Sequence, residues 1–206
     1  MARSTTPEEV LRRVEEEEIK FIVLQFTDIT GSVKSATIPA KRLEETFERG
    51  VWFDGSSVEG FARIYESDML LIPDPSTFCV LPWEPENMRK ARLICDVYTP
   101  DYRPFEGDPR YILKRAIQRA RDMGYTYNVG AEIEFFLFKM DEVPRPQPVP
   151  HDVGGYFDFS PRDQAAVVRS EVICLLQAMG IEIEMDHHEC SPGQHEVCLL
   201  YTSPSP

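Results

Sequence analysis

Residues 130–138 have the composition of a buried β-strand, yet they carry two acidic side chains, and this combination constrains the fold more than any other stretch. The segment is short and rich in β-branched and aromatic residues, with helix-like and proline-rich sequence on either side. Because residues i and i+2 of a strand point to the same face, Glu132 and Glu134 should project side by side. The alternate apolar residues from Ile133 to Leu137 should then face a core.

Two like charges held together in an apolar strand are unfavourable unless a positive group neutralises them. A bound divalent cation is the simplest such group, because hard cations prefer carboxylate oxygens as ligands. The alternative is an edge strand whose acids are exposed to water, and this segment alone does not exclude it. The choice between the two therefore depends on acids elsewhere in the chain.

A second acidic stretch, residues 184–196, contains Glu189, Glu196 and three of the four histidines of the chain. A Ser-Pro-Gly sequence between the two glutamates predicts a turn, and a hairpin closed there would bring them roughly opposite each other. Together with Glu132 and Glu134 they could converge on one site for Mg²⁺ or Mn²⁺, whereas zinc would more often bring thiolates or histidines. The alternative is a polar hairpin in water, and each histidine by itself is more typical of a structural role.

The composition sets broad limits on the class of protein. The chain has 206 residues, enough for one large or two small domains with cores of their own. Its net charge of −13 argues against nucleic acid or an anionic membrane as the main partner. Five scattered cysteines without a Cys-x-x-Cys pair are typical of a reducing compartment. The chain shows neither an N-terminal signal segment nor an apolar run of membrane-spanning length, so a cytoplasmic location is expected.

Periodic and capped segments predict an α+β chain with a domain boundary near residues 99–108, where proline, glycine and charge accumulate. Before this boundary, Thr6 and Glu9 form a capping box that starts a helix, and Gly50 ends a second helix that begins at residue 39. After it, Asp108 opens a helix that runs to Met123. The other predicted elements are strands at residues 20–26, 32–38, 69–72, 91–97 and 181–185, a proline-rich loop at 141–155, and a helix that begins at Ser160 and Pro161.

Residues 52–57 form a further polar segment, in which Asp54 precedes a glycine and two serines. Taken alone, this segment is typical of a plain turn. Followed by residues 66–68, however, it begins an ordered set of motifs in which the chain resembles the N-terminal part of type I glutamine synthetase. The other motifs, in the order of the family, are residues 130–138, 154–157, 187–189 and 193–196, and the resemblance extends from about residue 15 to residue 197.

The resemblance implies a fold, an activity and an assembly. The fold is a small β-grasp domain over residues 1–103, followed by the first part of the α+β catalytic domain over residues 104–197. The activity is the ligation of glutamate and ammonium to glutamine, in which ATP phosphorylates the side-chain carboxylate of glutamate and ammonia then displaces phosphate. The assembly is a homo-oligomer, a dodecamer in this family, whose active sites are shared between neighbouring subunits and hold Mg²⁺ or Mn²⁺.

The same resemblance implies ligands for metal and nucleotide. Glu134, Glu189 and Glu196 correspond to the ligands of the metal next to glutamate, and Glu132 corresponds to a ligand of the metal next to the phosphates. Glu184 corresponds to an acid that contacts the nucleotide. Phosphoryl transfer between two anions needs charge neutralisation, and hard cations held by carboxylates provide it.

The catalytic residues that the resemblance implies surround the ammonium site. Asp54 corresponds to the acid that binds ammonium and takes its proton, acting in the active site of the neighbouring subunit. Asp68 and Tyr156 correspond to residues that line this site. A carboxylate suits the role of Asp54, because it both attracts a cation and accepts the proton that ammonium must lose before it can attack.

The end of the chain departs from the family pattern. The family continues after residue 197 with a strand of the catalytic sheet, whereas residues 198–206 form a Ser/Pro-rich ending that we interpret as non-native. The family members are also much longer, so we interpret the chain as part of a truncated parent. By itself it is expected to lack synthetase activity, and an assay of ATP-dependent glutamine formation tests that expectation.

Three other functions fit parts of the sequence. A ligase of the same fold could join glutamate to a different amine, and comparing ammonium with alkylamines would separate the two. A hydrolase could use Glu132 and Glu134 as acid and nucleophile, in which case activity would persist in a chelator. A truncated, non-catalytic homologue could bind nucleotide or cap a synthetase ring, which calorimetry with Mn²⁺ and ATP, together with sizing of the assembly, would reveal.

Overall fold

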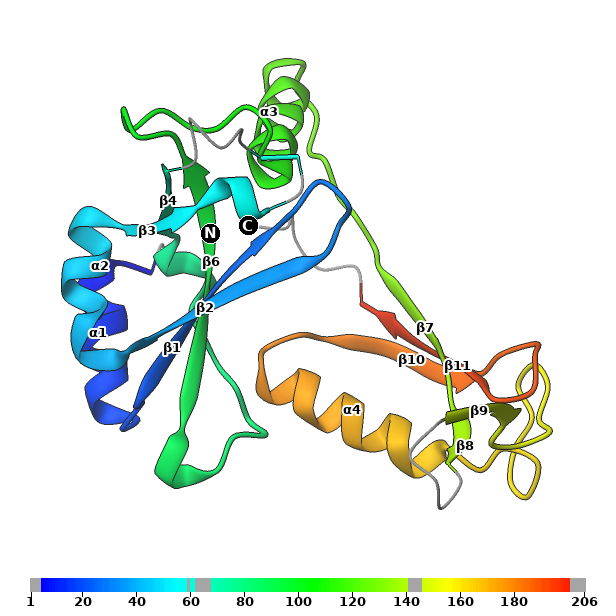
Figure 1. Ribbon diagram of the computed structural model, residues 1–206. Helices are drawn as coiled ribbons and strands as arrows, with labels where there is room; N and C mark the ends of the chain where they lie inside the picture. The colour runs from blue at the N-terminus through cyan, green and yellow to red at the C-terminus, as the bar shows by residue number, and fades with distance from the viewer. Residues whose placement is uncertain (1–4, 59, 62–67, 141–145, 201–206) are drawn as a thin grey trace. The chain divides into compact units, whose positions relative to one another are not determined.

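The computed structural model describes residues 5–58, 60–61, 68–140 and 146–200. The chain forms two compact units that divide between Tyr127 and Asn128, which we call the N-terminal unit and the C-terminal unit (Figure 1). The domain boundary at residues 103 and 104 stays a prediction, because compact units reflect packing rather than family domains. Within the described residues, no helix is both long and apolar enough to cross a membrane.

The N-terminal unit is built on a six-stranded sheet in the order β2-β1-β6-β4-β3, with β5 beside β6 (Figure 1). β1 and β6 run parallel to each other, and the other neighbouring strands are antiparallel. The predicted strands and helices of this unit are confirmed, and most of their ends differ by about a residue. The helix predicted from residue 39 instead begins with a 3-10 turn at Ala40–Arg42, and its α-helical part starts at Leu43. The strands are β1 Phe21–Thr27, β2 Val33–Pro39, β3 Val51–Asp54, β4 Asp68–Pro73, β5 Cys79–Val80 and β6 Lys90–Tyr98. The helices are α1 Pro7–Glu16, α2 Leu43–Arg49 and α3 Pro109–Asp122, with 3-10 turns η1 Ala40–Arg42, η2 Gly55–Ser57, η4 Pro75–Thr77 and η5 Glu86–Met88.

Local sequence signals set the ends of the first two helices. The amide of Glu9 donates to Thr6 Oγ1 at 3.3 Å and the amide of Thr6 donates to Glu9 Oε2 at 3.1 Å, which is the predicted capping box. Gly50 ends α2 with a φ of 70°, and a Cβ there would lie 2.7 Å from the carbonyl oxygen of Leu71. The core of this unit includes Val10, Val14, Ile22, Leu24, Leu43, Leu71, Leu93 and Val97.

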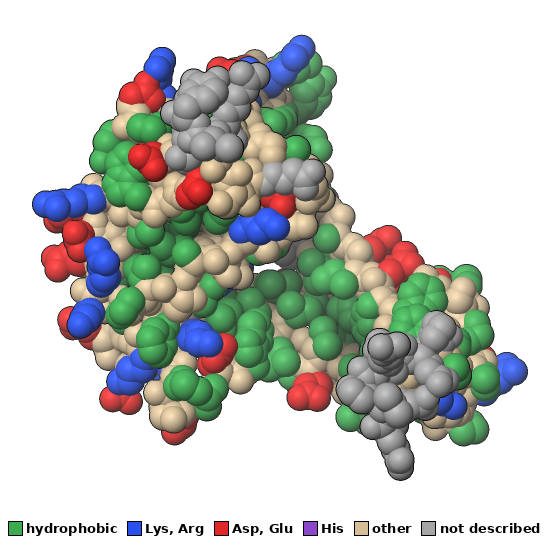
Figure 2. Space-filling view, viewed as in Figure 1, with side chains coloured by type: hydrophobic (Ala, Val, Ile, Leu, Met, Phe, Trp, Pro, Cys, Tyr) green, Lys and Arg blue, Asp and Glu red, His purple; other side chains and the backbone are tan. Residues whose placement is uncertain are grey.

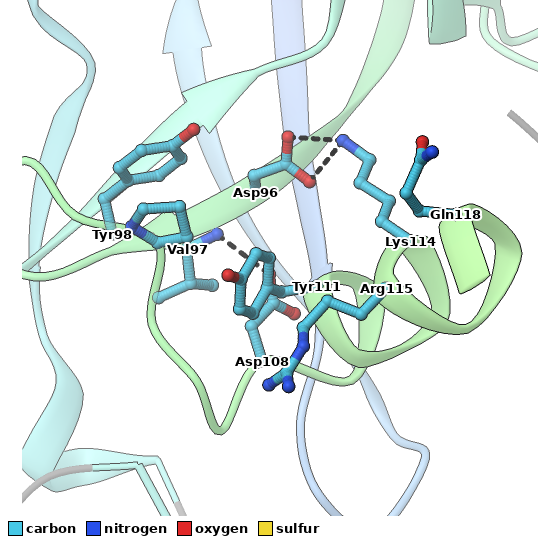
Figure 3. A pocket seen from close by; sticks show the side chains of 9 residues that line it. Asp96, Val97, Tyr98, Asp108, Tyr111, Lys114, Arg115 and Gln118 are labelled. Atoms are coloured by element: carbon cyan, nitrogen blue, oxygen red, sulfur yellow. Dashed lines mark hydrogen bonds and ion pairs between the residues drawn. The ribbon is translucent and has the colours of Figure 1, made fainter. Parts of the chain in front are cut away.

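The helix α3 has its predicted bounds but buries little of its apolar face. Asp108 caps its start by accepting a hydrogen bond from the amide of Arg110 at 3.0 Å. Arg110 pairs with Asp96 of β6 at 2.6 Å. Figure 3 shows that Lys114 reaches the same carboxylate, at 2.7 Å. Among the described residues of the helix, Ile117 alone is buried. Ion pairs therefore attach α3 to the sheet more than apolar packing does.

Asp28, in the turn between β1 and β2, should make the stability of the N-terminal unit depend on pH. Its buried carboxylate accepts from the hydroxyl of Thr30 at 2.7 Å and from the amide of Ser32 at 2.9 Å, and it pairs with Lys34 at 3.1 Å. The Thr30 hydroxyl is the main cause that lowers the pKa of Asp28 to about 2, although burial opposes it. An unfolded aspartate has a pKa of about 3.9, so this stabilisation is complete above that pH and is lost as the pH falls toward 2.

We therefore expect Asp28→Asn to lower the free energy of unfolding at a pH of about 5 and to have a smaller effect at a pH of about 2. Urea unfolding followed by circular dichroism at both pH values measures this difference. Glu44→Gln, at an exposed position of α2, serves as the control. An equal effect of Asp28→Asn at both pH values would contradict the expectation.

The C-terminal unit has a three-stranded antiparallel sheet in the order β10-β11-β7, and a separate pair of strands, β8 and β9 (Figure 1). The predicted hairpin turn is confirmed, because the amide of Glu189 donates to the carbonyl oxygen of Gln194 at 2.8 Å between β10 and β11. Helix α4 packs against β10 and β11 through Arg169, which contacts Asp186 and His195. The elements are β7 Glu132–Phe136, β8 Phe138–Met140, β9 Pro146–Pro150, α4 Ala166–Ala178, β10 Ile183–His188 and β11 Gln194–Leu199.

Three local predictions for this unit are wrong. Residues 132–136 form a strand as predicted. The prediction that Ile133 faces a core is wrong, because β7 is the edge of its sheet and Ile133 is 44% exposed. The helix predicted from Ser160 begins at Ala166, after turns in which a long-range hydrogen bond from the amide of Gln164 to Asp152 fixes the chain. The predicted loop at 141–155 contains β9, while residues 141–145 lie outside the described residues.

The surface of the C-terminal unit carries many apolar side chains (Figure 2). The largest exposed ones include Phe136, Phe138, Met140, Phe159 and Val167. At the end of the chain, Cys198 and Leu199 belong to β11, whereas residues 201–206 lie outside the described residues. The interpretation of residues 198–206 as non-native therefore stays a prediction.

Candidate functional site

The register of the three-stranded sheet places acids in a row on one face, which we call the acidic face. Glu134 of β7 is paired with Glu196 of β11, and Glu196 is in turn paired with His187 of β10. Directly paired residues on neighbouring strands point to the same side of a sheet. The three side chains therefore form one line across the sheet, and two positions along it Glu132 is paired with Cys198.

Glu189 joins this row by a route that differs from the predicted one. The hairpin register places His187, not Glu189, opposite Glu196, because Glu189 pairs with Gln194 beside the turn. The imidazole of His187 nevertheless lies between the two carboxylates. Its Nδ1 is 3.5 Å from Glu189 Oε1 and its Nε2 is 3.5 Å from Glu196 Oε2. Both glutamates thus contact one buried ring, and the predicted proximity of the two is retained.

The burial of these acids decreases from the hairpin toward the sheet edge. Glu196 is 7% exposed, and Glu189 is partly buried. A hydrogen bond from the amide of Cys190 at 2.9 Å is the main reason that the pKa of Glu189 lies below its ordinary value. Glu134 is exposed and accepts from Gln194 Nε2 at 2.7 Å. The row therefore presents carboxylate oxygens from a buried hairpin to an open edge.

Glu132 and Glu184 lie close to the same row. Both are exposed, and Glu184 occupies the irregular part of β10 where the register shifts. Burial is the main cause that raises the pKa of the Cys198 thiol to about 12, followed by its hydrogen bond to Glu196. The negative charges of Glu132 and Glu184 contribute to the same rise. The charges of both residues thus act on one sulfur atom, and the register places Glu132 on the acidic face, whereas Glu184 lies at the register shift and has no paired residue that assigns its face.

Tyr156 lies beside the hairpin end of this row. Its ring centroid is 5.3 Å from that of His187, and the Phe157 ring contacts Tyr156 edge-on and His187 at a tilt. Desolvation raises the pKa of the Tyr156 hydroxyl, and the negative charges of Glu189 and Glu196 raise it further. The structure thus groups this predicted catalytic residue with the predicted metal ligands.

The other two predicted catalytic residues belong to the N-terminal unit. Asp54 and Asp68 are paired with each other across β3 and β4. Asp54 accepts hydrogen bonds from the hydroxyl of Ser56 at 2.6 Å and from that of Ser57 at 3.0 Å, and these lower its pKa. The remaining part of the predicted motif, residues 66–67, lies outside the described residues.

Sequence reasoning missed a buried charge network on the opposite face of the sheet. Arg169 of α4 donates to Asp163 at 2.7 Å, to Asp186 at 2.6 Å and to His195 Nδ1 at 3.0 Å. In the segment that follows β9, Asp152 Oδ1 lies 3.0 Å from His188 Nε2. The sequence of α4 contains an arginine among mostly apolar residues, but this pattern does not reveal the partners of Arg169.

A second group of possible metal ligands, His151, Asp152 and His195, fits a metal poorly. Arg169 donates to Nδ1 of His195, so the neutral ring carries its proton on Nε2 and has no lone pair left for a metal. Burial lowers the pKa of His195 to about 4, and the positive charges of His188 and Arg169 act in the same direction. A cation at this place would face the same repulsion.

Comparisons with known proteins agree with the geometry of both units. The model of the glutamine synthetase β-grasp domain matches residues 18–100, and that of the glutamine synthetase catalytic domain matches residues 106–205. The glutamine synthetase of Methanosarcina mazei is 55% identical over 197 residues, which cover 96% of this chain and 44% of that protein. The glutamine synthetase of Thermotoga maritima is 49% identical over 196 residues, which cover 95% and 45%.

Solved structures support the same fold. A structure described as apo GmaS without ligand matches with a TM-score of 0.82 and 27% identity, over 94% of this chain and 45% of that one. Glutamine synthetase of Plasmodium falciparum matches with a TM-score of 0.78 and 20% identity, over 96% and 44%. The predicted β-grasp and catalytic folds are thereby confirmed, and the chain spans less than half the length of the relatives that it matches.

Proposed function

Because the chain belongs to the glutamine synthetase family, we propose that its acidic face holds a divalent metal ion for the ATP-dependent joining of glutamate and ammonia. One observation carries the proposal: Glu134, Glu196 and His187 form a row across three strands, with Glu189 at its end. Three carboxylates in one row with a buried imidazole are typical of a site that is completed by a cation.

The donor set fits the metals of this family. Glu134, Glu189 and Glu196 offer carboxylate oxygens, which are the ligands that Mg²⁺ and Mn²⁺ prefer. Glu132 lies two residues further along β7 and would contribute to a second ion. When bound, such ions neutralise the negative charge of the glutamate side chain and of the phosphates. We assign contact with the nucleotide to Glu184, whose charge acts on the same Cys198 thiol as that of Glu132.

The protein supplies the acid–base groups for the amine. Hydrogen bonds from Ser56 and Ser57 keep Asp54 ionised, so it can attract ammonium and accept its proton. Asp68, paired with Asp54, adds a second carboxyl group, and Tyr156 offers a hydroxyl beside the metal ligands. We place Asp54 and Asp68 in the active site of a neighbouring subunit within a cytoplasmic homo-oligomer, as family membership suggests.

A chimera tests the reaction. In it, the matched residues of this chain replace those of the Methanosarcina mazei relative, which is 55% identical over 197 residues. We expect ATP-dependent glutamine formation with ammonium and little product with methylamine, because the acid–base groups at Asp54 suit a small cation. Coupled phosphate release measures both, with the parental enzyme as the control. A chimera that assembles and binds Mn²⁺ but forms no glutamine would contradict the proposal.

A further inference from the structure

Asp152 lies at the point where three segments of the C-terminal unit meet, and its side chain is 0% exposed. Its Oδ1 accepts from the amide of Gly193 at 2.9 Å and lies 3.0 Å from His188 Nε2. The same oxygen is 3.4 Å from the amide of Gly154. Its Oδ2 accepts from the amide of Gln164 at 3.0 Å. One carboxylate therefore joins the β10–β11 hairpin, the loop before α4 and the end of β9.

Each of these partners adjoins a residue of the acidic face. Gly193 is in the turn that separates Glu189 from Glu196, and His188 directly precedes Glu189. On the loop side, Gly154 lies two residues before Tyr156. The hydrogen-bond partners of Asp152 are His188 and the backbone amides described above, and none of them is a carboxylate of the acidic face. Its side chain can therefore act on the acidic face only through the backbone that it holds.

The loop and the strand fit closely at this point. A Cβ on Gly154 would lie 2.5 Å from Nε2 of the His188 ring, closer than real Cβ contacts. Phe157 adopts a φ of 58°, and its amide donates to the carbonyl oxygen of His188 at 3.0 Å. A non-glycine residue in the left-handed region is strained unless its surroundings hold it there. The loop that carries Tyr156 is thus fixed against the strand that carries the ligands.

We propose that Asp152 is a positioning residue that holds the Tyr156 loop and the Glu189–Glu196 hairpin in the one arrangement in which the carboxylates converge. The inference rests on the proposed metal site, because it assigns a role to the shell of bonds behind that site. Hydrogen bonds that orient metal ligands typically contribute about 10–100-fold to metal affinity. Asp152 has both oxygens engaged as acceptors, so an isosteric amide cannot satisfy all of its donors.

The test compares Mn²⁺ binding by the 206-residue chain and its variants. Free Mn²⁺ is counted by electron paramagnetic resonance, and the number of water molecules on bound Mn²⁺ is obtained from water-proton relaxation. We expect Asp152→Asn to weaken binding by about 10-fold or more, and the bound ion to gain water as a carboxylate is displaced. Gly154→Ala should do the same from the loop side, because the new Cβ meets His188. Gly155→Ala is the matched control, because its Cβ would have its nearest neighbour at 3.8 Å.

The outcomes separate this inference from the proposed function. Unchanged affinity and an unchanged water count in Asp152→Asn and Gly154→Ala would overturn the positioning role. Weaker binding without a change in the water count would also overturn it, since a smaller folded fraction explains that result. If Asp152→Asn does not fold, as judged by circular dichroism, the Gly154→Ala and Gly155→Ala pair decides. Failure of the wild-type chain to bind Mn²⁺ would instead contradict the proposed ligand set and everything that rests on it.

Discussion

Replacing Glu196 with glutamine should weaken the binding of Mn²⁺ to the chain by about 100-fold or more. Residues that only hydrogen-bond to metal ligands already contribute up to about 100-fold to metal affinity, and a direct ligand should contribute at least as much. Glu196 is the most buried carboxylate of the acidic face and stands between Glu134 and His187 in the row. Glutamine keeps the shape of the side chain but removes the charge that a hard cation prefers. Free Mn²⁺ measured by electron paramagnetic resonance gives the affinity directly.

In the absence of metal, the same substitution should not destabilise the protein. Without a cation, the charge of Glu196 is repelled by Glu134 and Glu189, so its removal should leave the free energy of unfolding in chelator unchanged or higher. Glu182→Gln, at an exposed position before β10, should change neither quantity. If Glu182→Gln weakened binding as much as Glu196→Gln, a diffuse acidic surface rather than a defined site would explain the affinity.

The sequence predicted features whose causes lie close together along the chain. The capping box of Thr6 and Glu9 and the positive φ of Gly50 depend on neighbouring residues, so they could be recognised directly. The edge position of β7 could not, because it depends on which strands pair. A strand with alternating acids and apolar residues suits a covered position equally well, and only the observed sheet order leaves Ile133 exposed.

The sequence predicted which residues form the site but not how their strands pair. The family motifs identified Glu134, Glu189 and Glu196, and the turn signal placed the last two on one hairpin. The exact pairing depends on how the turn closes, and a shift of two residues inserted His187 between the glutamates. Asp152 was beyond reach, because its bond to Gly193 spans 41 residues of sequence.

Arg169→Met should destabilise the C-terminal unit by about 3–5 kcal/mol, because it leaves buried carboxylates without their cation. The side chain of Arg169 is 5% exposed and donates to Asp163, which is 3% exposed, and to Asp186. It is also the link between α4 and the strands of the acidic face. Amide hydrogen exchange in β10 and β11 measures the loss, with β1 and β6 of the N-terminal unit as an internal reference.

A second substitution distinguishes lost charge pairing from lost packing. Adding Asp163→Asn to Arg169→Met should recover part of the stability, because it removes one of the two uncompensated charges while keeping the side-chain shape. Arg162→Met, which breaks an ion pair of a 66% exposed arginine with Asp158, should cost less than about 1 kcal/mol. If Arg169→Met cost no more than Arg162→Met, the network would be incidental to the fold. A large cost that Asp163→Asn partly restores would show that the sheet beneath the acidic face depends on charge neutralisation on its covered side.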